Sequence, residues 1–235
     1  MRKMRLILHR PRWCRCEDDG GFIFFEKMFS EFYFCLSAGS LIRKKPIEAP
    51  NETIHRMTID DSDIILAMRA NPQSGFRLFM KKYGEAVYWH IRRLVVSHAD
   101  AQDAAQETFV RIFRSFDRFK GDGSFVAWIY RIATNEALRM LDRRKKVERP
   151  FDGSDADMNA MAFDGYVDYS DLEAVKLQRA ILSLPTRQRL VFNLRYYDEL
   201  DYGRIAEITD STVAAAKSNY HIAKDRIVSY MNSHE

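Results

Sequence analysis

The chain of 235 residues contains few cysteines, and their position limits what they can do. All three, Cys14, Cys16 and Cys35, lie within the first 35 residues. A disulfide framework is therefore excluded for the rest of the chain, which suits a reducing compartment. A Cys-x-Cys pair without a second pair of ligands is weak evidence for zinc, so we expect neither a metal nor another cofactor.

A long uncharged apolar run is also missing. In the most apolar stretch, residues 21–42, the charged residues Glu26, Lys27 and Glu31 intervene well before the ~18 residues that a spanning helix needs. The same charges break the apolar region of a signal peptide. Both a membrane anchor and secretion are disfavoured, and we expect the protein in the cytoplasm.

The motifs of common enzyme classes are absent from the sequence. The histidines are scattered without the i, i+4 pairing around a glutamate that metalloproteases use, and neither a glycine-rich phosphate loop nor a nucleophile elbow occurs. We therefore expect a protein that acts by binding and has no small-molecule substrate. A small helical hydrolase is the remote alternative.

The net charge of +4 comes entirely from residues 1–56, since the chain from Met57 onward contains 26 basic and 26 acidic residues. Any affinity for nucleic acid must then come from local patches. Regular patterning also begins only after Met57, so we expect residues 1–56 to be a dispensable or poorly ordered extension, with Met57 as a candidate start. The alternative is that residues 22–34 form an amphipathic helix that packs on the first domain or on a membrane surface.

Apolar residues recur three or four positions apart, and no useful run alternates apolar and polar residues as a β-strand does. This pattern predicts an all-α fold. The first such face contains Phe76, Phe79, Met80, Tyr83, Val87, Ile91 and Leu94. Further helices are predicted at residues 99–116, 124–146, 174–183, 186–197, 202–208 and 212–230. Seven acidic residues and no Lys or Arg between Pro150 and Glu173 predict a flexible acidic linker over 149–173. Two small helical domains result, at 57–148 and 174–235.

The last two helices have the pattern of a helix-turn-helix. The inner face of the second would hold Val213, Ala216, Tyr220, Ala223 and Ile227. Lys217, Ser218 and His221 point the other way, and Thr212 lies where an oxygen acceptor can cap the helix. A plain helical hairpin remains the alternative, because the signature is loose.

A stripe of four residues follows the helix at 124–146, namely Trp128, Arg131, Asn135 and Arg139. A ring that can stack a base, an amide that can bond a base edge and two guanidinium groups that can hold phosphates suit a separated DNA strand. Arg143 extends the positive charge. The alternative is a solvated basic helix with a half-buried tryptophan.

The helix at 99–116 has a polar side formed by Asp103, Gln106 and Glu107. Such a side can dock a protein partner, but acids and bases four residues apart also form solvated pairs on ordinary surface helices.

Three motifs occur in one order: Asp103-Ala104-x-Gln106-Glu107-Thr108-Phe109, Phe125-x-x-Trp128-x-Tyr130-Arg131-Ile132-Ala133-x-Asn135, and Leu184-Pro185 ahead of the helix-turn-helix. Over about residues 60–230 the chain resembles the extracytoplasmic-function sigma factors, the small initiation subunits of bacterial RNA polymerase. The resemblance implies a protein that recruits core polymerase to promoters and helps to open the minus-ten region. It further implies as partners the core polymerase, promoter DNA and an anti-sigma factor, which many family members have.

The resemblance also implies a role for each group of residues. Asp103, Gln106 and Glu107 would dock the polymerase clamp helices. The minus-ten element would be bound by Lys120, Ser124, Trp128, Arg131, Asn135, Arg139 and Arg143. The minus-thirty-five element would be bound by Thr212, Lys217, Ser218 and His221. Three positions depart from the family pattern: Gly203, Ser211 and the pair Ala215-Ala216. The rival function is a free-standing helix-turn-helix regulator, for which the second domain suffices.

Overall fold

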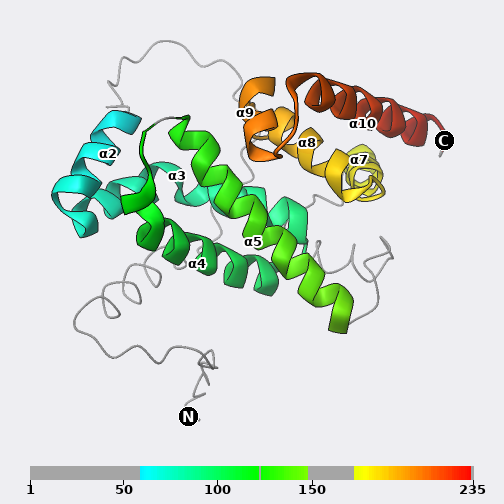
Figure 1. The fold of residues 1–235 in the computed structure, drawn as a ribbon. Coiled ribbons are helices and arrows are strands. Elements are labelled where there is room, and N and C mark those ends of the chain that lie inside the picture. The colour runs from blue at the N-terminus through cyan, green and yellow to red at the C-terminus, as the bar shows by residue number, and fades with distance from the viewer. Residues whose placement is uncertain (1–58, 122, 148–171, 234–235) are drawn as a thin grey trace, which may run out of the picture. The chain divides into compact units, whose positions relative to one another are not determined.

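The computed structural model describes residues 59–121, 123–147 and 172–233, and every regular element in these ranges is a helix (Figure 1). The all-α prediction is therefore confirmed. The elements before the gap are α2 (Asp61–Ala70), α3 (Pro72–Val95), α4 (His98–Ser115), the 3-10 turn η1 (Phe116–Arg118) and α5 (Phe125–Val147). Those after it are α7 (Leu172–Leu182), α8 (Thr186–Tyr196), α9 (Tyr202–Ile208) and α10 (Val213–Ser233).

Side-chain caps set the starts of the long helices. The Asn71 side chain accepts a hydrogen bond from the Ser74 amide at 3.0 Å, and Pro72 occupies the first turn of α3. The hydroxyl of Ser124 accepts from the Ala127 amide at 3.3 Å and begins α5. These caps satisfy amides that have no partner within the helix, and α5 begins one residue after its predicted start at residue 124.

The core of the first half is aromatic and lies between α3, α4 and α5. All seven residues of the predicted α3 face are buried. The Phe79 ring meets Phe109 and Phe125 edge to face at 6.4 and 6.5 Å. Helix α2 is held close to α3 at Gly75, where a Cβ would lie 2.2 Å from the Met68 backbone nitrogen. The chain can make this approach only because glycine lacks a side chain.

The second half has its own apolar core between α7, α8 and α10. It consists of Ala180, Ile181, Leu184, Phe192, Ala223 and Ile227. Helix α9 packs across α10 and completes the helix-turn-helix. No described helix is long and apolar enough to cross a membrane.

Two predicted segments fall on residues that the structure does not describe. The extension at 1–56 lies wholly outside the described ranges, and so do residues 149–171 of the acidic linker. Helix α7 begins at Leu172, two residues before the helix start predicted at residue 174, so Leu172 and Glu173 belong to this helix. An acidic residue in the first turn stabilises a helix through its dipole, so Glu173 suits this position.

Candidate nucleic-acid interface

Helices α9 and α10 form a capped helix-turn-helix. Asp201 begins α9 by accepting from the Arg204 amide at 3.0 Å, and Thr212 begins α10 by accepting from the Ala215 amide at 3.1 Å. Asp210 in the turn has a φ of 50°, a conformation that aspartate tolerates better than most residues. Ser211 bonds Thr209 through their hydroxyls at 2.8 Å, which adds a polar contact within the turn.

The outer face of α10 is where the sequence predicts it. Lys217, Ser218 and His221 are exposed, whereas Ala216, Ala223 and Ile227 are buried. Val213 was predicted on the inner face and is 44% exposed, so that assignment is wrong. It is the first residue of α10 and lies at the edge of the buried face, beside the exposed residue Thr212.

The stripe on α5 presents three exposed polar residues in line. Arg131, Asn135 and Arg139 are four residues apart and exposed, and Arg143 continues the line. Lys120 is exposed in the loop before α5, while Ser124 is half-buried and caps the helix. The structure therefore brings the predicted cations and amide onto one side of α5.

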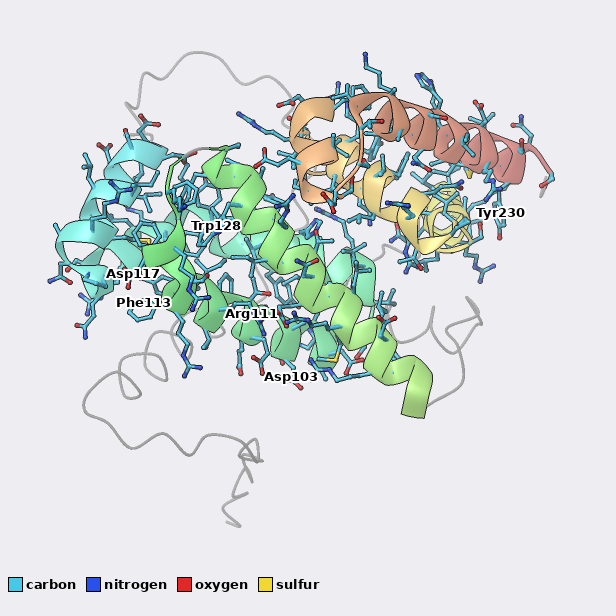
Figure 2. All side chains as sticks on the ribbon, viewed as in Figure 1. Asp103, Arg111, Phe113, Asp117, Trp128 and Tyr230 are labelled. Atoms are coloured by element: carbon cyan, nitrogen blue, oxygen red, sulfur yellow. The ribbon has the colours of Figure 1, made fainter. Side chains whose placement is uncertain are left out.

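Trp128 differs from the rest of this stripe. It is half-buried, and its ring lies 5.2 Å from that of Phe119 and 5.9 Å from that of Phe125, with Phe116 at 6.4 Å (Figure 2). The indole thus closes the aromatic core at the start of α5. This packing matches the alternative of a half-buried tryptophan, and only its solvent-facing part is left for a base.

Two arginines of the stripe already have partners within the chain. Arg139 donates to Glu136 at 2.8 Å, and the same carboxylate oxygen accepts from Arg111 of α4 at 2.6 Å. The Glu136 side chain is only 3% exposed, so a buried carboxylate binds both guanidinium groups. Arg131 donates from Nε and Nη2 to the Glu207 carbonyl of α9, at 3.1 and 2.5 Å.

The predicted protein-docking side of α4 is polar and accessible (Figure 2). Asp103 is exposed, and Gln106 and Glu107 are half-buried. Partial burial raises the pKa of the Glu107 carboxyl, and the nearby charge of Glu136 raises it further. Burial and the neighbouring Asp100 also raise the pKa of Asp103, although solvent screens most of this effect at an exposed side chain.

Sequence reasoning missed the residues that act through contacts distant in the chain. Glu136, His90 and Asp198 were not singled out, yet each makes a buried polar contact with a residue distant in the chain. A charged residue on the buried side of a helix, as Glu136 is, could have signalled a paired arginine. Within the ranges that the structure describes, no group of three or more His, Cys, Asp or Glu could hold a metal ion.

Two family models match this chain. Sigma-70 region 2 matches residues 79–147, and Sigma-70, region 4 matches residues 174–227. The chain is 30% identical over 179 residues to the ECF RNA polymerase sigma-E factor of Escherichia coli K12, covering 72% of this chain and 93% of that protein. It is 29% identical to the RNA polymerase sigma-H factor of Pseudomonas aeruginosa over 178 residues, 71% of this chain and 91% of that protein.

Solved structures give the same fold. CnrH in complex with the cytosolic domain of CnrY matches with a TM-score of 0.56 at 20% identity, over 74% of this chain and all of that one. The sigma factor RpoE of Bartonella quintana, in complex with the anti-sigma factor NepR, matches with a TM-score of 0.52 at 20% identity, over 68% of this chain and 98% of that one. At this identity the similarity concerns the fold alone.

Proposed function

We propose a role for each surface of this chain, which belongs to the extracytoplasmic-function sigma factors of the sigma-70 family and directs RNA polymerase to initiate at specific promoters. The two matched regions lie in the two helical halves, and we propose 57–148 and 174–235 as its domains. The observation that carries the proposal is that one chain has both an exposed polar stripe on α5 and an exposed polar face on α10.

The α4 surface is proposed to dock core polymerase. Asp103 is exposed and Gln106 and Glu107 are half-buried, so these three polar side chains are accessible on one side of α4. The expected counterpart is a basic surface of the polymerase clamp.

The α5 stripe is proposed to capture the separated minus-ten strand. Guanidinium groups hold phosphates, and an amide can bond a base edge. Arg131, Arg139 and Arg143 would supply the first contact and Asn135 the second, with Lys120 and Ser124 close to the strand. Since Trp128 is half-buried, its part in stacking would be limited to the exposed part of the indole.

The outer face of α10 is proposed to enter the major groove at the minus-thirty-five element. Thr212 and Lys217 would hold phosphates near the start of the helix, while Ser218 and His221 would face base edges. Contacts to phosphates position the protein, and contacts to base edges give it sequence preference.

The protein is proposed to act by binding, without catalysis of its own, alongside polymerase in the cytoplasm. An anti-sigma partner is proposed because both solved structures named above are complexes. CnrH is bound to the cytosolic domain of CnrY, and RpoE is bound to the anti-sigma factor NepR. The rival function, a free-standing regulator, leaves the α4 surface and the α5 stripe without a use.

Run-off transcription with purified core polymerase tests the function. We expect specific transcripts only when the chain and core are both present, and weak binding of the chain alone to promoter duplex. Tight, specific binding without core, together with no new transcript when core is added, would establish the free-standing regulator instead.

A further inference from the structure

One buried carboxylate contacts the α5 stripe. The Oε1 atom of Glu136 accepts from Nη1 of Arg139, three residues further along the same helix, at 2.8 Å. The same oxygen lies 2.6 Å from Nε of Arg111. Arg111, labelled in Figure 2, comes from α4, which packs against α5. The carboxylate is therefore fixed between two helices.

The burial of Glu136 distinguishes this contact from an ordinary surface ion pair. Its side chain is 3% exposed, whereas those of Arg139 and Arg111 are 54% and 47% exposed. Each guanidinium group is thus bonded on one side to a buried charge while the rest of it reaches solvent. An exposed pair three residues apart would restrain its arginine weakly, because water competes for both charges and salt screens them.

The bonded nitrogen decides which edge of Arg139 is presented to a ligand. The three nitrogens of a guanidinium group are about 120° apart in one plane, so the edge between Nε and Nη2 points directly away from Nη1. Nη1 is bonded to the carboxylate, and Arg139 makes no other hydrogen bond with the residues that the structure describes. The Nε–Nη2 edge, which can bind a phosphate through two parallel hydrogen bonds, therefore points away from Glu136.

Holding an arginine in one orientation strengthens its contact with a phosphate. An unrestrained arginine samples many rotamers, and ordering one such side chain on binding weakens affinity by a factor of about 2 to 10. In this chain the bond to Glu136 orders Arg139 before any ligand arrives. Part of the entropic cost of binding is then already met by the fold.

We propose that Glu136 is a positioning residue for the capture of the minus-ten strand, and that it acts by keeping the Nε–Nη2 edge of Arg139 directed at a backbone phosphate of that strand. The inference rests on the proposed function, because it gives a task to a residue bonded to the same stripe. Glu136 itself does not touch DNA. The length of its side chain matters as well as its charge, since a shorter carboxylate would lengthen the contacts with both arginines.

Glu136→Asp is the main variant, because it shortens the side chain by about 1.5 Å and keeps the charge. NMR of the free full-length chain measures the order parameter of the Arg139 Nε–H bond. We expect a high value in the unmodified chain and a value below about 0.6, as in flexible groups, in Glu136→Asp. Arg143 makes no hydrogen bond with the described residues, so its Nε–H bond should be flexible in both chains.

Promoter opening by core polymerase with the full chain is the second measurement, at a promoter mapped by run-off transcription. Glu136→Asp should lower the permanganate reactivity of minus-ten thymines by about 2- to 10-fold at limiting chain concentration. In a chain that already carries Arg139→Gln, the same substitution should cause no further loss, because the residue through which Glu136 acts is gone. Glu85→Asp, the same change at an exposed glutamate of α3, should leave opening unchanged.

Glu136→Gln is a second variant for the case that Glu136→Asp does not fold, because it keeps the length of the side chain. It also removes a charge that repels phosphates, so opening is compared with that of the unmodified chain at moderate salt, where this repulsion is screened. We expect Glu136→Gln to lower both the order parameter of Arg139 and promoter opening.

Three results would overturn the proposal. The order parameter of Arg139 could stay high in the variants, opening could equal that of the unmodified chain, or the loss could be as large in the Arg139→Gln chain, which would show that Glu136 only supports the fold. The order parameter is recorded without polymerase or DNA. A chain that directs no transcription would therefore refute the proposed function, while the NMR result still decides whether Glu136 positions Arg139.

Discussion

Replacing Asn135 by alanine separates the function of the α5 stripe from its stability. Asn135 is exposed in the middle of α5, and its side chain makes no hydrogen bond with the residues that the structure describes. The substitution removes no hydrogen bond with the described residues, and alanine is up to about 0.7 kcal/mol more favourable than asparagine inside a helix. We expect Asn135→Ala to melt at the same temperature as the unmodified chain, or slightly higher.

The effect on promoter opening should be large by comparison. A side chain that bonds a base edge contributes about 1–3 kcal/mol to discrimination. Since 1.4 kcal/mol corresponds to a factor of ten, opening should fall by about 5- to 150-fold at limiting concentrations. Recruitment of polymerase to the closed promoter should change little, because Asn135 contributes no charge.

Permanganate reactivity of thymines in the minus-ten region measures opening, and a mobility shift with core polymerase measures recruitment. Asn232→Ala is the control, because Asn232 is an exposed helical asparagine like Asn135 but lies near the end of α10, away from the proposed DNA surfaces. Unchanged thymine reactivity in a folded Asn135→Ala protein would refute the assignment of the stripe to the separated strand.

Three further predictions concern the other surfaces. Glu107→Gln and Asp103→Asn should weaken core binding without lowering the melting temperature at pH 7. A raised carboxyl pKa favours the folded state below the ordinary pKa, and this contribution is lost as the pH rises through the raised pKa, so neither carboxyl stabilises the fold at pH 7 in this way. A drop in the melting temperature of either variant would contradict this prediction. Lys217→Ala should weaken all promoters alike and His221→Ala should shift the preferred minus-thirty-five bases, as selection on randomised promoters would show; an unaltered preference in His221→Ala would count against groove entry by this face. A chain that starts at Met57 should transcribe as well as the full chain and melt within a few degrees of it, whereas loss of most run-off product would show that the preceding residues belong to the active protein.

The helices and most of their buried faces could be predicted because they follow from local rules. Periodicity places Phe79 and Ile91 in the core, and oxygen acceptors ahead of a helix, such as Thr212, mark its first turn. Val213 was misplaced because the period alone does not say where a neighbouring helix ends. Burial at the first turn of a helix depends on what lies opposite it.

Contacts between distant residues could not be predicted from the sequence. His90 and Asp198 are separated by 108 positions, and nothing in the local pattern of either residue marks the other as its partner. The pair Glu136 and Arg111 likewise joins two helices, although a carboxylate on a buried helical face already implies a nearby cation. Such partners are fixed by how the helices pack, which the period of each helix leaves open.

The proposed functional residues differ in whether the fold needs them, and this difference decides how each should be tested. Asn135 and Ser218 are exposed and make no hydrogen bond with the described residues, so their substitution tests the proposed DNA contacts with little effect on the fold. Trp128 completes the aromatic core, and truncating a large core aromatic costs roughly 3–5 kcal/mol, of which a half-buried ring would lose a part. Loss of activity in Trp128→Ala would thus follow from damaged packing as readily as from a lost base contact. Only residues without a structural task give variants whose defect can be attributed to DNA.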